Sequence, residues 1–320
     1  MTAIDTTRRR AEPVPAPPTE QEPQEPPPPI WASAGPPAAR PPLPPAAVAI
    51  MRVALLCTLA SVWFVSFALG IGGLQSTRDQ QLRYEQLREH LALGTTPIGG
   101  VIRPGTPIVL LTAPRIGLRQ AVVEGTASSD LAGGPGHRRD TPLPGQPGTS
   151  VVYGRAVAFG GPFQRITQLR GGDVITAITG QGSFEYQVVG VRHAGDPLPD
   201  PIGSDTGRLS LVSVEGASWR EGWAPDQLVY VDALLKGRPQ QAPAGRPTLV
   251  PRAETAMQGD PGAWVAVVLW LQVLIAGAGA AAWAQARWGS AQAWLSCSPV
   301  IIAGLWGASE GAIQLLPNVL

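Results

Sequence analysis

Hydrophobic and polar positions divide the chain into segments of three kinds. Uninterrupted apolar runs occupy residues 53–74, 263–286 and 291–309. The first run, from Val53 to Leu74, carries no charge for 22 residues, which is the length that a helix needs to cross a bilayer. The pattern therefore predicts three transmembrane helices, within residues 47–75, 262–286 and 291–317.

The two later runs are separated only by the sequence RWGS, which predicts an antiparallel helical hairpin. Arginines cluster before the first run, up to Arg52, whereas the segment after it mixes both charge signs. The positive-inside rule then places the N-terminus in the cytoplasm and the following domain outside. The same orientation returns the hairpin turn, with Arg287, to the cytoplasmic side. The sequence thus predicts a multi-pass protein of the cell membrane.

Between the first and second apolar runs the sequence pattern changes to short runs of β-branched residues separated by glycine and proline. This pattern is typical of strands and turns. Residues 96–236 are therefore predicted to form an all-β barrel or sandwich with a short helical turn at 162–169. The predicted strands are Ile108–Thr112, Gln120–Glu124, Thr149–Gly154, Val174–Thr179, Ser183–Val191, Arg208–Val214 and Leu228–Ala233.

Three connecting segments complete the organisation. Residues 1–46 are rich in proline and poor in residues that could be buried, so a disordered cytoplasmic tail is predicted. Residues 76–95 predict a juxtamembrane helix that ends at Gly94. Residues 237–261 form a second linker rich in proline and glycine.

Composition excludes several function classes. The net charge of +1 gives no basis for nucleic acid as a partner. The two cysteines, Cys57 and Cys297, both lie in apolar runs, where free cysteines usually serve as small packing residues and a disulfide is not expected. No histidine or carboxylate spacing indicates a metal site, and no cofactor is predicted.

Several motifs within the β-region point to one family. EGT, GPGH and T-x-x-PG occur in order within residues 122–154, and PFQRITQLRGGDVI follows at 162–175. LSLVSVEG (209–216) and LVYVDALL (228–235) look like the last two strands of the same domain. This stretch resembles the sortase family, in particular the actinobacterial class E/F sortases, in motif order and in its membrane anchor. The resemblance implies an all-β sortase-like barrel of about seven or eight strands with short helical turns.

Sortases are cysteine transpeptidases of the Gram-positive envelope, and the resemblance implies where their three catalytic groups would stand. The family's histidine position holds Arg155, its cysteine position holds Val214 and its arginine position holds Gln227. His137, in the GPGH motif, matches a loop histidine of the family and not the catalytic one. The chain therefore resembles a degenerate sortase without the catalytic cysteine, histidine and arginine, with Arg155, Val214, Gln227 and His137 marking a vestigial cleft.

Three functions stay open on this basis. The favoured one is an inactive extracytoplasmic binding or scaffolding module whose partners are envelope proteins or peptides. The alternative is an active transpeptidase or hydrolase with a relocated nucleophile, Ser213 or Ser210 with His137, although Ser213 should face away from Val214 on a strand. The third is an assembly factor whose main partner lies within the membrane.

Two charged residues have both a functional and an ordinary interpretation. Arg155 could hold a carboxylate above Val214, but an arginine at a barrel rim more often reaches solvent or pairs with an acid such as Glu215. Glu310 is the only acidic residue in or beside the apolar runs, and its place near the end of the third run favours the outer membrane interface.

Overall fold

The computed structural model describes residues 44–215 and 227–320. The predicted disordered tail lies outside these residues except for positions 44–46, of which 45 and 46 already belong to a helix. The chain divides into two compact units, Met1–Ala54 and Leu55–Leu320. The described part of the first unit is the beginning of a helix. The barrel and the helices that contact it belong to the second unit.

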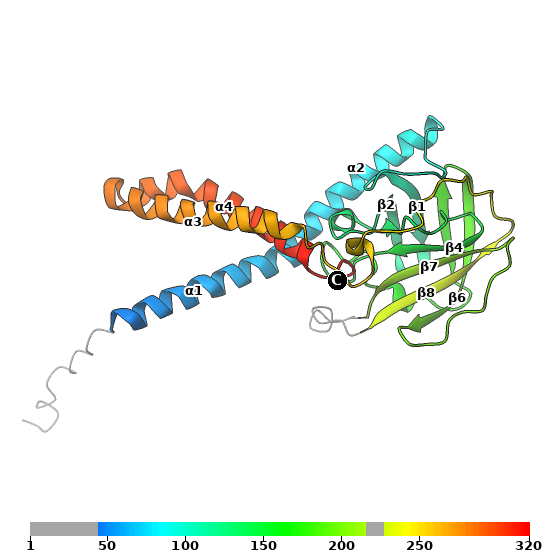
Figure 1. Cartoon of the computed structure of the whole chain (residues 1–320), viewed down its shortest axis with the longest axis horizontal. Coiled ribbons are helices and arrows are strands. Elements are labelled where there is room, and N and C mark those ends of the chain that lie inside the picture. The colour runs from blue at the N-terminus through cyan, green and yellow to red at the C-terminus, as the bar shows by residue number, and fades with distance from the viewer. Residues whose placement is uncertain (1–43, 216–226) are drawn as a thin grey trace, which may run out of the picture. The chain divides into compact units, whose positions relative to one another are not determined.

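Eight strands close into a barrel in the order β1-β2-β3-β4-β7-β8-β6-β5 (Figure 1). All seven predicted strands are confirmed, and the closed order decides for a barrel over a sandwich. The eighth, β3, has only two residues within the GPGH motif, which is too short to give an alternating pattern. The bounds are β1 Pro107–Ala113, β2 Leu118–Glu124, β3 Gly136–His137, β4 Gly148–Tyr153, β5 Val174–Thr179, β6 Gly182–His193, β7 Gly207–Val214 and β8 Leu228–Lys236.

β7 is buried along its whole length, which means that both of its faces are covered. Leu209 and Leu211 point into the main core, inside the barrel. Val212 and Val214 belong to a second apolar cluster on the other face of the strand. Since alternate side chains of a strand point to opposite faces, segments from outside the barrel must cover the second face.

One uninterrupted helical stretch precedes the barrel. It consists of α1 (Pro45–Ser66), the π-helical segment η2 (Phe67–Ile71) and α2 (Gly72–Ala92). The predicted stop is confirmed, because Gly94 adopts a left-handed conformation (φ 65°) just after α2. α2 lies against β1 and β2, where Leu87 packs with Leu110 and Ala121. No loop separates the apolar half of this stretch from the half that contacts the barrel.

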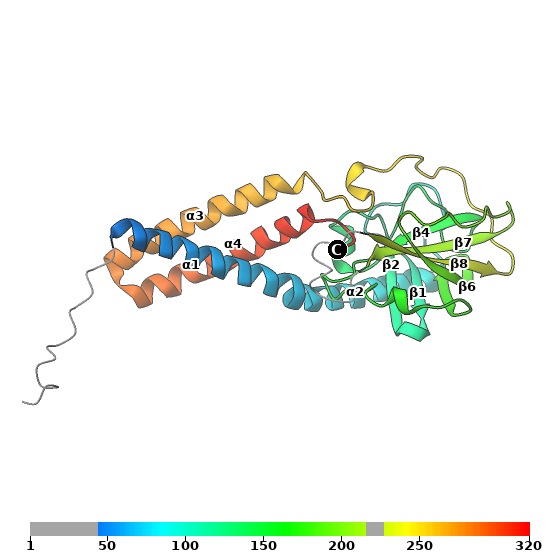
Figure 2. The same cartoon turned by 90° about the horizontal axis from the view of Figure 1, so that it is seen from below.

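The last two helices, α3 (Ala263–Trp288) and α4 (Ser290–Leu315), lie side by side as the predicted hairpin (Figures 1 and 2). Glycines let the two helices approach closely, because a Cβ on Gly304 or Gly311 would lie 2.8 Å from a side chain of α3. Among the described residues, two helices are long and apolar enough to cross a membrane, Pro45–Ala92 and α3. α4 is not one of them, so the third membrane span stays a prediction.

A loop after β4 joins the barrel to the π-helical segment. The amide of Phe159 donates a hydrogen bond to the carbonyl of Ala68 in η2 (3.3 Å). Phe159 also packs in an apolar cluster with Phe67 and with Ile313 of α4. A Cβ on Gly72 would lie 3.1 Å from the Phe159 ring, so glycine allows this close approach. The loop that starts at Arg155 therefore contacts both helical segments.

Substitution of Gly136 by alanine should destabilise the barrel. The new methyl group would overlap the carbonyl oxygen of Gly125 and lie 2.8 Å from Leu131, and overpacking of this kind costs about 1–3 kcal/mol. We expect a lower midpoint of thermal unfolding for the detergent-solubilised chain. Gly190→Ala is the matched control, because nothing lies within 4 Å of its added methyl group. Equal midpoints for the two variants would contradict the packing described for β3.

Candidate functional site

Three residues selected from the resemblance, Arg155, Val214 and Gln227, lie at one end of the barrel wall. β4 and β7 are parallel and in register from Gly148/Gly207 to Tyr153/Val212. Arg155 and Val214 therefore stand at equivalent places, two residues beyond this last pair. β8 begins opposite Val214, and the amide of Glu215 donates to the carbonyl of Gln227 (3.2 Å). The strand register thus places Arg155, Val214 and Gln227 at the adjoining ends of β4, β7 and β8.

Val214 is not exposed in an open cleft. It is 4% exposed and packs in a cluster with Tyr153, Ala156 and Val319. The amide of Ala156 donates a hydrogen bond to the carbonyl of Val319 (3.1 Å), and Val319 itself is fully buried. Residues 316–320, which follow α4, thus cover this end of the barrel wall.

Asn318 holds this covering segment in place. Its side-chain amide donates to the carbonyls of Thr126 (2.7 Å) and Thr255 (3.1 Å), and its backbone amide donates to Gln258 (3.0 Å). Asn318 is fully buried, so these hydrogen bonds are shielded from water. The segment is therefore bonded both to the barrel and to the linker before α3.

Arg155 lies inside the protein and not at a rim. Its side chain has no exposed surface, and its Nη2 donates to the carbonyl (2.9 Å) and hydroxyl (2.7 Å) of Ser128. The guanidinium also lies 5.1 Å from the centre of the Phe159 ring. Burial lowers the pKa of Arg155 to about 10, so the group still carries its charge at neutral pH.

The expectation that Arg155 reaches solvent or pairs with Glu215 is wrong. The loop after β4 folds against η2 and α4, which encloses Arg155, whereas Glu215 lies 3.1 Å from Nε2 of His193. Sequence reasoning could not foresee this, because the covering residues come from η2 and α4, which are distant from Arg155 in the sequence. Gln227, in contrast, is exposed.

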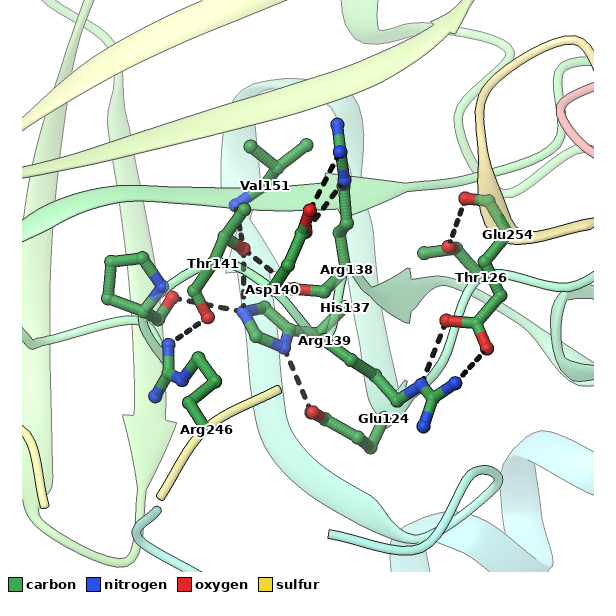
Figure 3. A network of polar contacts seen from close by, with 11 residues as sticks. Glu124, Thr126, His137, Arg138, Arg139, Asp140, Thr141, Val151, Arg246 and Glu254 are labelled. Atoms are coloured by element: carbon green, nitrogen blue, oxygen red, sulfur yellow. Dashed lines mark hydrogen bonds and ion pairs between the residues drawn. The ribbon is translucent and has the colours of Figure 1, made fainter. Parts of the chain in front are cut away.

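His137 belongs to a buried polar network, shown in Figure 3. Its Nδ1 lies 2.9 Å from a carboxylate oxygen of Glu124, and its Nε2 lies 3.0 Å from the carbonyl of Pro142 and 3.2 Å from the hydroxyl of Thr141. The Thr141 hydroxyl donates to the carbonyl of Arg138 (2.7 Å). Both ring nitrogens therefore hold the loop between β3 and β4 in place, which agrees with a structural role.

The serines considered as relocated nucleophiles are engaged elsewhere. The Ser213 hydroxyl donates to the carbonyl of Gly154 (2.8 Å), and that of Ser210 donates to Asp232 in a short hydrogen bond. Ser213 lies on the same face of β7 as Leu211, whereas Val214 lies on the other. A hydroxyl nucleophile needs a base within hydrogen-bond reach, and His137 is occupied by Glu124, Thr141 and Pro142.

The linker 237–261 contributes buried and half-buried polar residues that no motif or periodicity marks. Glu254 is 4% exposed and receives two hydrogen bonds from the guanidinium of Arg139 (Figure 3). Its carbonyl accepts from the hydroxyl of Thr126 (2.6 Å), and Arg246 donates to the carbonyl of Thr141. A proline-rich segment has no periodicity, so only the tertiary structure identifies these contacts. Within residues 44–215 and 227–320, no group of three or more His, Cys, Asp or Glu side chains could hold a metal ion.

Comparison with known proteins agrees with the motifs. Residues 111–208 match the family model of the sortase domain. Sortase D of Bacillus subtilis (strain 168) is 32% identical over 80 residues, which are 25% of this chain. The match spans 39% of the length of that curated relative. The part of the β-barrel from residue 111 to residue 208 is therefore similar in sequence to a sortase domain.

Solved structures similar to the chain are also sortases. A sortase D5 transpeptidase of Clostridium perfringens is 20% identical with a TM-score of 0.39, covering 51% of this chain and 98% of that one. The SrtF sortase of Corynebacterium diphtheriae is 23% identical with a TM-score of 0.38, covering 49% and 97%. Sortase E of Streptomyces avermitilis is 25% identical with a TM-score of 0.36, covering 48% and 100%.

Substitution of Asn318 by alanine should release the covering segment. The carbonyls of Thr126 and Thr255 would lose their donor, and each unsatisfied buried group costs about 1–3 kcal/mol. We expect faster hydrogen–deuterium exchange at the Ala156 amide and at residues 316–320. Leu249→Ala, at a position 85% exposed, is the control and should leave this exchange unchanged. Unaltered protection in the Asn318 variant would show that the segment does not depend on this side chain.

Asp130 should make the protein more stable as the pH falls. Burial raises the pKa of its carboxyl from 3.8 to about 6, with Glu254 adding to the rise. Between these two values the folded state holds a proton that the unfolded state has lost, so stability falls as pH rises, by up to about 1.4 kcal/mol per pH unit. Relative to Asp130→Asn, the unaltered chain should gain stability from pH 7 to pH 4.

Chemical denaturation of the unaltered chain and of Asp130→Asn across this pH range measures the difference between their free energies of unfolding. Asp205→Asn, which changes an exposed carboxyl, is the control and should show a difference that varies little with pH. A difference for the Asp130 variant that stays constant with pH would mean that this carboxyl is not shielded from water.

Proposed function

We propose that this chain is a membrane-anchored sortase-like protein without catalytic activity, which acts as a binding or scaffolding module in the cell envelope. The observation that carries the proposal is the state of the family's catalytic surface. By resemblance Val214 takes the nucleophile position, and it is buried in the same apolar cluster as Val319 of the same chain.

The chemistry of the family has no support at these positions. Acyl transfer through a covalent intermediate needs a nucleophile, a group that moves its proton, and donors for the developing oxyanion. Valine offers no nucleophile, and a buried guanidinium with a pKa of about 10 stays protonated and cannot act as a base near neutral pH. The free cysteines, Cys57 and Cys297, belong to α1 and α4 and not to the barrel.

The proposed location is the cell membrane, with the N-terminus in the cytoplasm and the barrel outside. Large apolar side chains are exposed along α1, α3 and α4, for example Leu59 (56%), Ile275 (73%) and Leu295 (80%). Such surface is stable in lipid but not in water. The orientation rests on the arginines before residue 53 and on Arg287 at the hairpin turn.

The partners would then be envelope proteins or peptides, or proteins within the membrane. A soluble fragment cannot decide between them, because residues 318–320 complete the packing of the barrel. Crosslinking of the full chain in its own envelope is the appropriate experiment. Partners that attach to the barrel favour the scaffolding module, and partners that attach to α3 and α4 favour the assembly factor.

The alternative, an active enzyme with a relocated nucleophile, is tested directly on the purified full chain. We expect no cleavage or transfer of a sorting-signal peptide, and no labelling of Ser213 or Ser210 by a serine-reactive probe, because both hydroxyls are buried and hydrogen-bonded. The variants Ser213→Ala and Ser210→Ala are the controls. Turnover or labelling that disappears in either variant would disprove the proposal.

A further inference from the structure

Two residues that the sequence marked as unusual line the same small cavity. Arg155 replaces the family's histidine, and Glu310 is the only acidic residue bordering the apolar runs. Both line a cavity of about 80 Å³, together with Ser128, Ser129, Phe159 and Gln314. One wall comes from loops of the barrel and the other from the last turns of α4. At ~10–15 Å³ for each water, the space can hold several waters or one phosphate-sized group.

Arg155 needs a counter-charge that the described protein does not provide. Its Nε and Nη1 are buried and have no hydrogen-bond partner, whereas Nη2 is satisfied by Ser128. Burial lowers its pKa, and within residues 44–215 and 227–320 the only hydrogen-bond partner of its side chain is the neutral Ser128. A buried charge without a partner is strongly unfavourable, and two unpartnered guanidinium nitrogens, with three N–H donors between them, beside a cavity indicate an anionic occupant.

The position of the cavity indicates where that anion comes from. It lies at the end of α4, where Phe159 and Ile313 pack with Phe67 of the preceding helix. Tryptophans lie just beside it: Trp306 makes an edge contact with Phe67, and the indole of Trp63 donates to Ser309 (3.1 Å). Tryptophan is enriched at the membrane–water interface, the depth at which lipid phosphates lie.

Glu310 indicates the kind of headgroup. It is exposed at the cavity, so its carboxylate opposes a ligand that carries only negative charge. A ligand with a phosphate and an amine satisfies both residues, with the phosphate at Arg155 and the amine at Glu310. We propose that this cavity binds the headgroup of an amine-bearing zwitterionic phospholipid, such as phosphatidylethanolamine. The inference rests on the membrane attachment proposed above, but not on the loss of catalysis.

The experiment titrates the delipidated full chain in detergent with short-chain lipids and counts the bound molecules by native mass spectrometry. We expect phosphatidylethanolamine to bind more tightly than phosphatidylglycerol, and both more tightly than inorganic phosphate. Arg155→Gln should lower the affinity for both lipids about tenfold or more, because it removes the phosphate contact. Glu310→Gln should lower the affinity for phosphatidylethanolamine, because it removes the contact with the amine. The same substitution should raise the affinity for phosphatidylglycerol, because it removes the repulsion between two negative charges.

Arg155→Lys serves where Arg155→Gln does not fold, and it should retain part of the affinity because it keeps the charge. Equal binding of phosphatidylethanolamine by the unaltered chain and the Glu310 variant would overturn the proposal. Inorganic phosphate bound as tightly as the lipids would also overturn it, in favour of a free anion. A double-mutant cycle on the free energy of unfolding, measured without lipid, is the last control. A favourable coupling energy between Arg155 and Glu310 would identify an internal ion pair and overturn the proposal.

Flotation with vesicles separates this inference from the function on which it rests. A chain that floats without preferring any headgroup would disprove the lipid site and leave membrane attachment intact. A chain that does not float would disprove the attachment itself.

Discussion

The contact between Val319 and the outer face of β7 is the constraint on which the rest of the site depends. β7 is buried on both faces, and its outer face is apolar because a valine stands where the family's nucleophile would be. Val319 packs on that face and accepts a hydrogen bond from Ala156. Residues 316–320 can hold this position only because α4 ends beside the barrel, so the hairpin and the barrel wall stabilise each other.

The enclosure of Arg155 follows from the same arrangement. The loop that begins at Arg155 is held at Ala156 by Val319 and at Phe159 by Ala68 of η2. An exposed loop would leave the guanidinium in water, but a loop bonded on both sides turns it inward. The loop that starts at Arg155 has thus become an internal contact between the barrel and the helices, and the Arg155 side chain lines a cavity.

The sequence was sufficient for the parts that depend on local pattern. Alternation and turn residues predicted seven of eight strands, and Gly94 marked the end of α2. The motif order gave the barrel and the equivalence of Arg155 and Val214. What it could not give were interactions between distant segments, namely the burial of Val319 in the same apolar cluster as Val214 and the ion pair between Glu254 and Arg139. The segments around Val319 and Glu254 have no periodicity, motif or charge pattern from which their contact partners could be predicted.

The helical stretch that runs without a loop through η2 into α2 restricts how the barrel can move to reach other proteins. A flexible stalk would let the domain sweep a wide volume, but a continuous helical stretch packed on β1 and β2 removes most of that freedom. The return of the chain through α4 adds a second attachment point. The barrel would then keep a constant height and a constant tilt angle relative to the bilayer. It would meet a partner only when that partner diffuses laterally to it.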